Sequence, residues 1–118
     1  MLNDAIRPNW FEYPGEYLRV VDLKVDNLEP WFFIDGEQLE NLNSGLKQRF
    51  PNVDLVPFAR RSDNDDVACW EKVSGNLKVY VVHDFSKWGW EKRKEYLDFW
   101  AWYRQAVEDM IEHGQPYR

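Results

Sequence analysis

Cysteine and histidine are scarce in this chain, and their scarcity limits the chemistry that it can carry out. Cys69 is the single cysteine, so an internal disulfide and a cysteine-rich metal cluster are both excluded. His83 lies beside Asp84 in a strand-like segment, where neighbouring side chains point to opposite faces and do not act together as a base and its orienting carboxylate. We therefore expect no cofactor and no metal site. We interpret His83 as a half-buried hydrogen-bonding residue, and Cys69 as a small buried hydrophobic residue.

Long apolar runs are missing as well. The opening stretch MLNDAIRPNWFEYPGEY does not combine a basic start with an apolar segment, as a signal peptide does. No apolar run approaches the ~20 residues that are needed to cross a bilayer. These features predict a cytoplasmic location and no membrane partner.

Basic runs are rare, and the net charge is −6. The nearest basic run, Lys92 to Lys94, is bracketed by Glu91 and Glu95, and we interpret it as an alternating-sign helix face. Nucleic-acid binders usually carry a basic patch, so direct nucleic-acid binding is disfavoured. An acidic chain is better suited to a basic protein partner, because complementary charges speed encounter and reject wrong partners.

What the chain does contain is typical of one folded domain. It has 118 residues, of which 44% are hydrophobic and 17% aromatic, and these proportions exclude wholesale disorder. The chain shows no internal repeat and no linker-like change of composition, which predicts a single domain. We expect strands that include an antiparallel hairpin, an irregular segment over residues 1–16 and a long C-terminal helix.

Hydrophobic spacing predicts the individual elements. Residues 17–25 are rich in β-branched and aromatic residues and predict a strand, with a helix over Gly15–Asp22 as the alternative. Asp35 begins a helical pattern that ends before Pro51. Strands are predicted at residues 31–34, 53–59, 66–71 and 77–85; Pro57 indicates an edge or a bulge in the second of them, and the last two form a hairpin.

The last predicted element is one helix from Trp90 to Glu112, ended by Gly114 and Pro116. Trp102 falls on the polar side of this helix. There it is either covered by a loop, which is the interpretation we favour, or exposed.

Two arginines and a run of acidic and amide residues lie between two of the predicted strands. Arg60, Arg61 and Ser62 precede Asp63, Asn64, Asp65 and Asp66. A calcium loop that started at Asp63 would need glycine at its sixth position and glutamate at its twelfth, where this chain has Ala68 and Ser74. Asp and Asn favour turns, so the segment predicts a turn whose like charges are offset by the arginines.

The stretches LVPFARRSDNDDVACWE and VYVVHDF, followed by an aromatic-rich helix, resemble the SUKH superfamily over about residues 31–112. The resemblance implies an α+β fold with one curved, mainly antiparallel sheet flanked by helices. Many bacterial members are thought to be immunity proteins that bind and neutralise a toxin domain, often a nuclease. No catalytic residues belong to the family, so none is carried over.

We therefore expect a non-enzymatic protein-binding domain whose partner is a basic toxin domain. The residues expected to contact the partner are Asp63, Asp65, Asp66, Trp88 and Trp102. We expect the polar side chains to be spread over the surface of the domain rather than to converge in a desolvated pocket. Two alternatives stay open, a small hydrolase that uses clustered carboxylates and a divalent metal, and a housekeeping interaction or scaffold domain. The sequence does not predict an oligomeric state.

Overall fold

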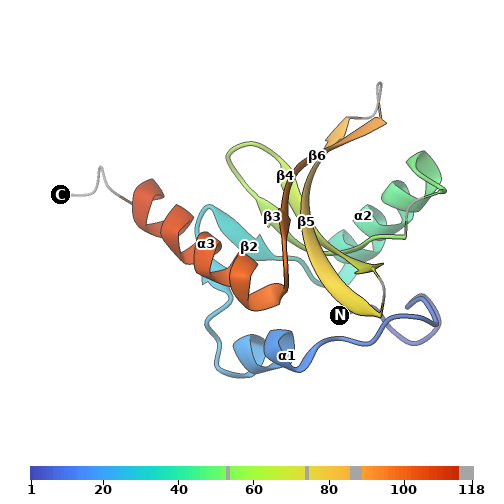
Figure 1. Cartoon of the computed structure of the whole chain (residues 1–118), viewed down its shortest axis with the longest axis horizontal. Coiled ribbons are helices and arrows are strands. Elements are labelled where there is room, and N and C mark those ends of the chain that lie inside the picture. Colours follow the sequence, from blue (N-terminus) through green and yellow to red (C-terminus); the bar gives the residue numbers. More distant parts are fainter. Residues whose placement is uncertain (53, 74, 86–88, 115–118) are drawn as a thin grey trace.

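A six-stranded antiparallel sheet with helices on both faces forms the molecule (Figure 1). The computed structural model describes residues 1–52, 54–73, 75–85 and 89–114, without the side chains of residues 84, 85 and 89–93. The strands follow one another across the sheet in sequence order. The elements are α1 Gly15–Asp22, β1 Asn27–Leu28, β2 Trp31–Phe33, α2 Gly36–Arg49, β3 Val56–Arg61, β4 Asp66–Val73, β5 Asn76–Phe85, β6 Gly89–Tyr96 and α3 Phe99–His113. The predicted α+β class is confirmed.

The two faces of the sheet carry different hydrophobic clusters. Side chains alternate along β4, so Ala68 and Trp70 pack with α1 and α3, whereas Val67 and Cys69 pack against α2. We call these the α3 face and the α2 face. In Figure 1, α3 and α2 lie on opposite sides of the strands.

Aromatic rings dominate the α3 face. Phe58 stacks on Trp70 with ring centroids 4.1 Å apart. The N-terminal segment adds Phe11, which lies 5.2 Å from the same indole and is 1% exposed. Trp102 of α3 completes the cluster. Its ring meets Phe58 edge-on at 4.9 Å, the arrangement that aromatic quadrupoles favour.

Several predicted elements are confirmed by the structure. The Asp35 side chain accepts a hydrogen bond from the Gly36 amide and caps α2, which ends at Arg49, with Phe50 as its C-cap before Pro51. The β4–β5 hairpin is antiparallel, and the register of β3 shifts between Pro57 and Ala59, as expected for a bulge at this proline. Cys69 is free and buried.

The strand predicted over residues 17–25 is wrong, and the alternative helix is correct. Tyr17 and Val20, three residues apart, are the buried residues of α1. This spacing places both side chains on one helical face, and packing against the core overrides the preference of the β-branched residues for strands.

The long helix from Trp90 is also wrong in its first third. Residues 89–96 form β6, which pairs with β5 and lies at one edge of the sheet, and α3 begins only at Phe99. Glu, Lys and Arg have good helix propensity, but pairing with β5 decides the conformation. The charged stretch that was interpreted as a helix face therefore belongs to a strand at the edge of the sheet. Asp98 caps α3 through the Ala101 amide at 2.9 Å.

Candidate functional site

The charged segment between β3 and β4 forms a tight turn, as predicted. The Asp65 amide donates to the Arg61 carbonyl at 3.2 Å, and the Asn64 side chain accepts from the Asp66 amide at 3.0 Å. Asp65 has φ +61°, in the left-handed region that Asp and Asn tolerate better than most residues. Hydrogen bonds and backbone conformation together fix the shape of the turn.

Both arginines pair with carboxylates of the same turn. The Arg61 guanidinium binds Asp63 through two atoms, with Nε to Oδ1 at 2.8 Å and Nη2 to Oδ2 at 3.0 Å. This hydrogen bonding lowers the pKa of Asp63 and raises that of Arg61. Arg60 Nη2 lies 3.0 Å from Asp65 Oδ1. The arginines therefore offset the repulsion between the carboxylates, as expected.

Arg61 also ties the turn to α3. Its Nη1 lies 3.4 Å from Asp109 Oδ2, and its guanidinium lies 5.8 Å from the centre of the Trp31 ring. Asp109 accepts hydrogen bonds from Trp31 Nε1 at 2.9 Å and from Gln105 Nε2 at 3.0 Å. The turn is thus anchored through one arginine to both β2 and α3. Trp31 and Asp109 are 78 residues apart, and no local pattern in the sequence predicts their contact.

Asp66 lies in a different environment from the other turn carboxylates. It begins β4 on the α3 face and is only 6% exposed, and its Oδ1 lies 3.1 Å from His83 Nδ1. The expectation that Asp66 contacts a partner does not fit this position, because the carboxylate is turned inward to an internal partner. His83 is half-buried and hydrogen-bonded, as expected.

Our interpretation of the sequence did not predict the contact between Asp66 and His83, although the register of the hairpin contains it. Asp66 and His83 are directly opposed in the β4–β5 register. Val73 faces Asn76 in this register, so a count outward from a two-residue loop at 74–75 places Asp66 opposite His83. A predicted hairpin therefore predicts this pair only if its loop length is also specified.

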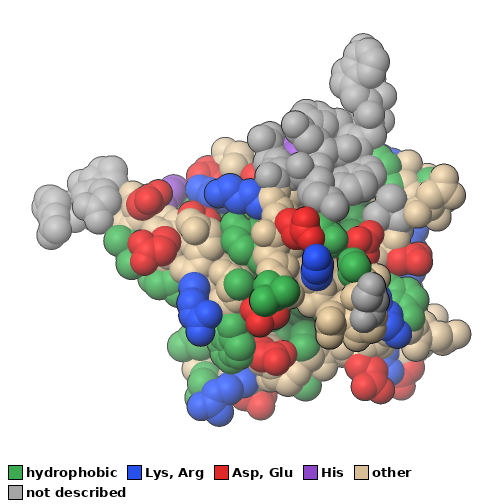
Figure 2. All heavy atoms as spheres, in the orientation of Figure 1, with side chains coloured by type: hydrophobic (Ala, Val, Ile, Leu, Met, Phe, Trp, Pro, Cys, Tyr) green, Lys and Arg blue, Asp and Glu red, His purple; other side chains and the backbone are tan. Residues whose placement is uncertain are grey.

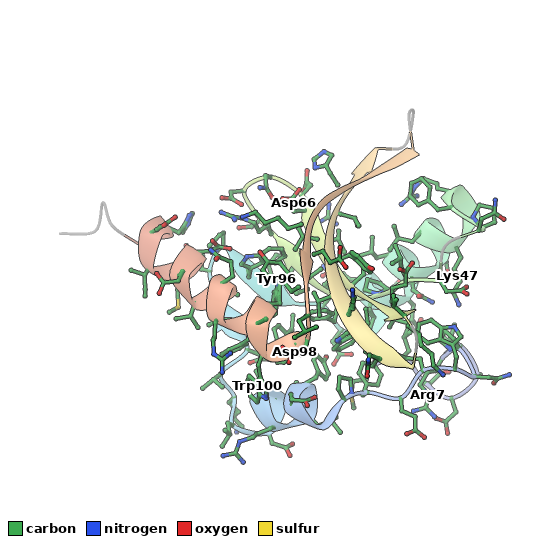
Figure 3. All side chains as sticks on the ribbon, in the orientation of Figure 1. Arg7, Lys47, Asp66, Tyr96, Asp98 and Trp100 are labelled. Atoms are coloured by element: carbon green, nitrogen blue, oxygen red, sulfur yellow. The ribbon has the colours of Figure 1, made fainter. Side chains whose placement is uncertain are left out.

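Asp66 also lines a hollow of about 340 Å³ between the sheet and α3, together with Trp31, Arg61, Asn64, Tyr96 and Asp109. Figure 3 labels Asp66 and Tyr96 in the region between α3 and the strands. Burial raises the pKa of Tyr96, and the Asp109 carboxylate adds to that effect. Polar groups thus gather beside α3 in a hollow that is open to solvent. The expectation that they do not converge in a desolvated pocket stays a prediction.

The chemistry available in the hollow is limited. An Asp–His pair orients an imidazole, which is one part of a nucleophilic centre. The described residues that line the hollow include no serine, threonine or cysteine. Within the described residues, no three His, Cys, Asp or Glu side chains are grouped so that they would hold a metal ion.

The two tryptophans expected at the interface have different outcomes. Trp88 lies outside the described residues. Trp102 is 1% exposed and packs against Trp31 with ring centroids 5.3 Å apart, so it is covered and offers no surface to a partner. The buried residues of α3 are Phe99, Trp102 and Ala106, whereas the predicted apolar stripe placed Trp102 on the polar side. Residues 99, 102 and 106 are three and four positions apart and so lie on one helical face, which packs against the aromatic cluster.

No protein-family model matches the chain, and neither a curated protein nor a solved structure does. The resemblance to the SUKH superfamily therefore depends on the residues of this chain alone. Among the described residues, no helix combines the length and the apolar character that a membrane span requires.

Proposed function

We propose that this chain is a non-enzymatic protein-binding domain, similar to the SUKH immunity proteins, that binds a basic toxin domain through the β3–β4 turn. The observation that carries the proposal is the rigid presentation of exposed carboxylates. The side chains of Asp63 and Asp65 are 37% and 72% exposed, and both are held by arginines within a turn of fixed shape. Groups that are already ordered lose little conformational entropy on binding.

The surroundings of the turn support the same proposal. His113, at the end of α3, lies close enough to lower the pKa of Asp63, and its Nε2 lies 3.4 Å from Glu29 Oε1. The Glu29 side chain is 66% exposed. Asp63, Asp65 and Glu29 thus present carboxylates at the surface, each beside a basic side chain. On the face drawn in Figure 2, carboxylates and cations are interspersed, which favours recognition by the position of individual charges rather than by bulk charge.

The binding test uses a double charge reversal at the exposed positions. If this chain is an immunity protein, its toxin is expected to be encoded by a neighbouring gene. In Asp63→Lys with Asp65→Lys, we expect the affinity for that toxin domain to fall about 10-fold or more, measured by calorimetric titration. Asp66 is left intact because its pair with His83 is part of the fold. The matched control is Glu37→Lys with Glu40→Lys, which gives the same change in net charge at two exposed positions of α2.

Two results would contradict the proposal. In the first, cells that express the neighbouring toxin are not protected by this chain. In the second, the turn variant and the α2 control bind the toxin domain equally well. The second result would contradict binding through the β3–β4 turn even if the chain does protect the cells.

A further inference from the structure

Helix α3 carries apolar side chains on two of its faces. Phe99, Trp102 and Ala106 face the sheet and are buried. Trp100 and Val107 are seven residues apart and are only half-buried. They lie on a second stripe, about a third of a turn around the helix from the first. Because a soluble helix that is apolar on more than one face is usually covered on more than one face, this second stripe is a candidate docking surface.

A shallow hollow of about 600 Å³ follows the second stripe and is open to solvent. Trp100, Arg104, Val107 and Glu108, which follow one another at helical spacing, are part of its lining, and we call these four residues the outer stripe. In Figure 1, α3 lies at one side of the molecule, with the strands toward the other. An open surface of this kind suits a protein partner better than a small molecule, because small-molecule sites enclose most of their ligand.

The aromatic part of the hollow is held in one orientation before any partner binds. Trp100 and Tyr103 meet edge-on, with ring centroids 5.9 Å apart. The Tyr103 hydroxyl in turn donates to the Val25 carbonyl at 2.6 Å. Both rings also contact Phe99 of the buried cluster, at 5.6 Å and 5.9 Å. Ordered tryptophans are frequent anchors of protein interfaces, because they bury a large area and lose little conformational entropy on binding.

Two opposite charges accompany this anchor. Arg104 and Glu108 are both exposed and lie four positions apart on α3, which is about 6 Å along the helix axis. Neither side chain has an ion-pair partner within the part of the chain that the structure describes. A basic residue that precedes an acidic one by four positions is the less favourable order for a pair within one helix. Both charges are therefore available to another molecule.

A second copy of the chain carries the complementary arrangement of charges. We propose that the chain forms a homodimer through the outer stripe, with the two α3 helices antiparallel and the two-fold axis midway between Arg104 and Glu108 along the helix. Arg104 of one copy then lies opposite Glu108 of the partner subunit, and the symmetry supplies the same pair a second time. Val107 lies beside the axis, and Trp100 covers the last turns of the other helix.

Charge favours a second copy at this surface over others of the molecule. In a chain whose net charge is −6, most pairs of identical surfaces repel each other. The charges of the outer stripe sum to zero, and the two-fold axis places opposite charges in contact. The proposal does not depend on the toxin-binding function, because the β3–β4 turn is not part of the outer stripe.

Sedimentation velocity of the intact chain over a range of concentrations tests the dimer. We expect self-association with a Kd of about 1–100 µM, as for a small interface, so that the average mass rises from 14.3 kDa toward twice that value. A chain that stays monomeric at about 300 µM in low salt would overturn the proposal and would leave the outer stripe to a different partner.

The variants Arg104→Glu and Glu108→Arg distinguish this dimer from any other. Each variant alone places like charges opposite each other at both symmetric contacts, so we expect its self-association to weaken about 10-fold or more. An equal mixture of the two variants restores both opposite-charge pairs, and we expect a heterodimer whose affinity lies within about 3-fold of that of the parent chain. Both positions are exposed, so the melting temperatures of the monomers should stay unchanged.

The matched controls are Lys47→Glu and Glu40→Arg, which make the same changes of charge at exposed positions of α2. We expect both to self-associate as the parent chain does, and Asp63→Lys with Asp65→Lys to associate no more weakly, since its defect is expected in toxin binding alone. Equal weakening in the α2 controls and the α3 variants would show an effect of net charge and would overturn the proposal. Failure of the mixed α3 variants to associate would overturn the antiparallel arrangement.

Discussion

The α3 face and the α2 face of the sheet differ in the number and the kind of side chains that they bury. The α3 face is filled by large rings from the N-terminal segment, α1, β2, β3, β4 and α3. Among them, Phe11, Phe58, Trp70 and Trp102 are each no more than 1% exposed. The buried cluster of the α2 face is smaller and mostly aliphatic, with Leu46, Val67, Cys69 and Val82 among its members. Beside it, a pocket lies between α2 and β3. Because burial of large rings is a main source of stability, we expect the α3 face to contribute more to the free energy of unfolding than the α2 face.

The largest expected effect tests the α3 face directly. Trp102→Ala removes a ring that touches Trp31, Phe33, Phe58 and Phe99, so we expect the free energy of unfolding to fall by about 3–5 kcal/mol in chemical denaturation. Ile111→Ala, at a position on the same helix that is 46% exposed, should change it by no more than about 0.5 kcal/mol. A loss below about 1.5 kcal/mol in Trp102→Ala would contradict the importance given to this face.

Trp102→Phe sharpens that test. The Trp102 Nε1 atom is buried and has no hydrogen-bond partner, which carries a desolvation cost. A phenylalanine keeps most of the ring contacts and removes the unpaired N–H donor. We therefore expect the free energy of unfolding to fall by only about 1–2 kcal/mol. A loss equal to that of Trp102→Ala would show that indole shape, not burial, decides stability here.

Leu46→Ala makes the corresponding change on the α2 face. Leu46 is 3% exposed and packs in the smaller cluster. We therefore expect the free energy of unfolding to fall by about 2–3 kcal/mol, which is near the lower end of the range measured for Leu→Ala at buried positions. The matched control is Leu97→Ala, because Leu97 is 75% exposed and its truncation leaves no cavity. If Leu46→Ala proved more costly than Trp102→Ala, the order of the two faces would be reversed.

The polar end of the α3 face is expected to contribute less than its rings. Asp66→Ala removes a buried partner of His83, and we expect the free energy of unfolding to fall by about 1–3 kcal/mol. Asp65→Asn, one residue earlier but exposed and able to keep the left-handed backbone conformation, should change it by no more than about 0.5 kcal/mol. Equal effects at the two positions would show that burial of Asp66 has no energetic consequence.

Local signals predicted the parts of the fold that depend on neighbouring residues. The Asp35 cap with Pro51 predicted α2, and alternating side chains around a turn predicted the β4–β5 hairpin. The boundary between β6 and α3 was missed because WEKRKEY favours a helix by composition, whereas its pairing with Val79 to Phe85 is a tertiary effect. A cap signal at Asp98 was present in the sequence and would have placed the start of α3 correctly.

The candidate site was predictable only in its local part. The turn, its arginines and its exposed carboxylates follow from the order of residues 60–66. The anchor from Arg61 to Asp109 and Trp31 joins segments far apart in the chain, and so does the pocket between α2 and β3. Such contacts follow from how α2 and α3 cross the sheet, which hydrophobic periodicity alone does not determine.

The smallest expected effect is the pH dependence of the turn. Arg61 lowers the pKa of Asp63 below its ordinary value of 3.8, so the pair stabilises the folded chain above that pH and loses its effect as pH falls through the folded-state pKa. Solvent screens this half-exposed pair, which limits its contribution to about 0–1 kcal/mol. Between about pH 6 and pH 2.5, the parent chain should therefore lose slightly more unfolding free energy than Asp63→Asn, measured by denaturation at each pH. An identical pH dependence in the two proteins would show that the paired arginine orders the turn without stabilising the fold, and would leave the α3 face as the source of stability at this end of the molecule.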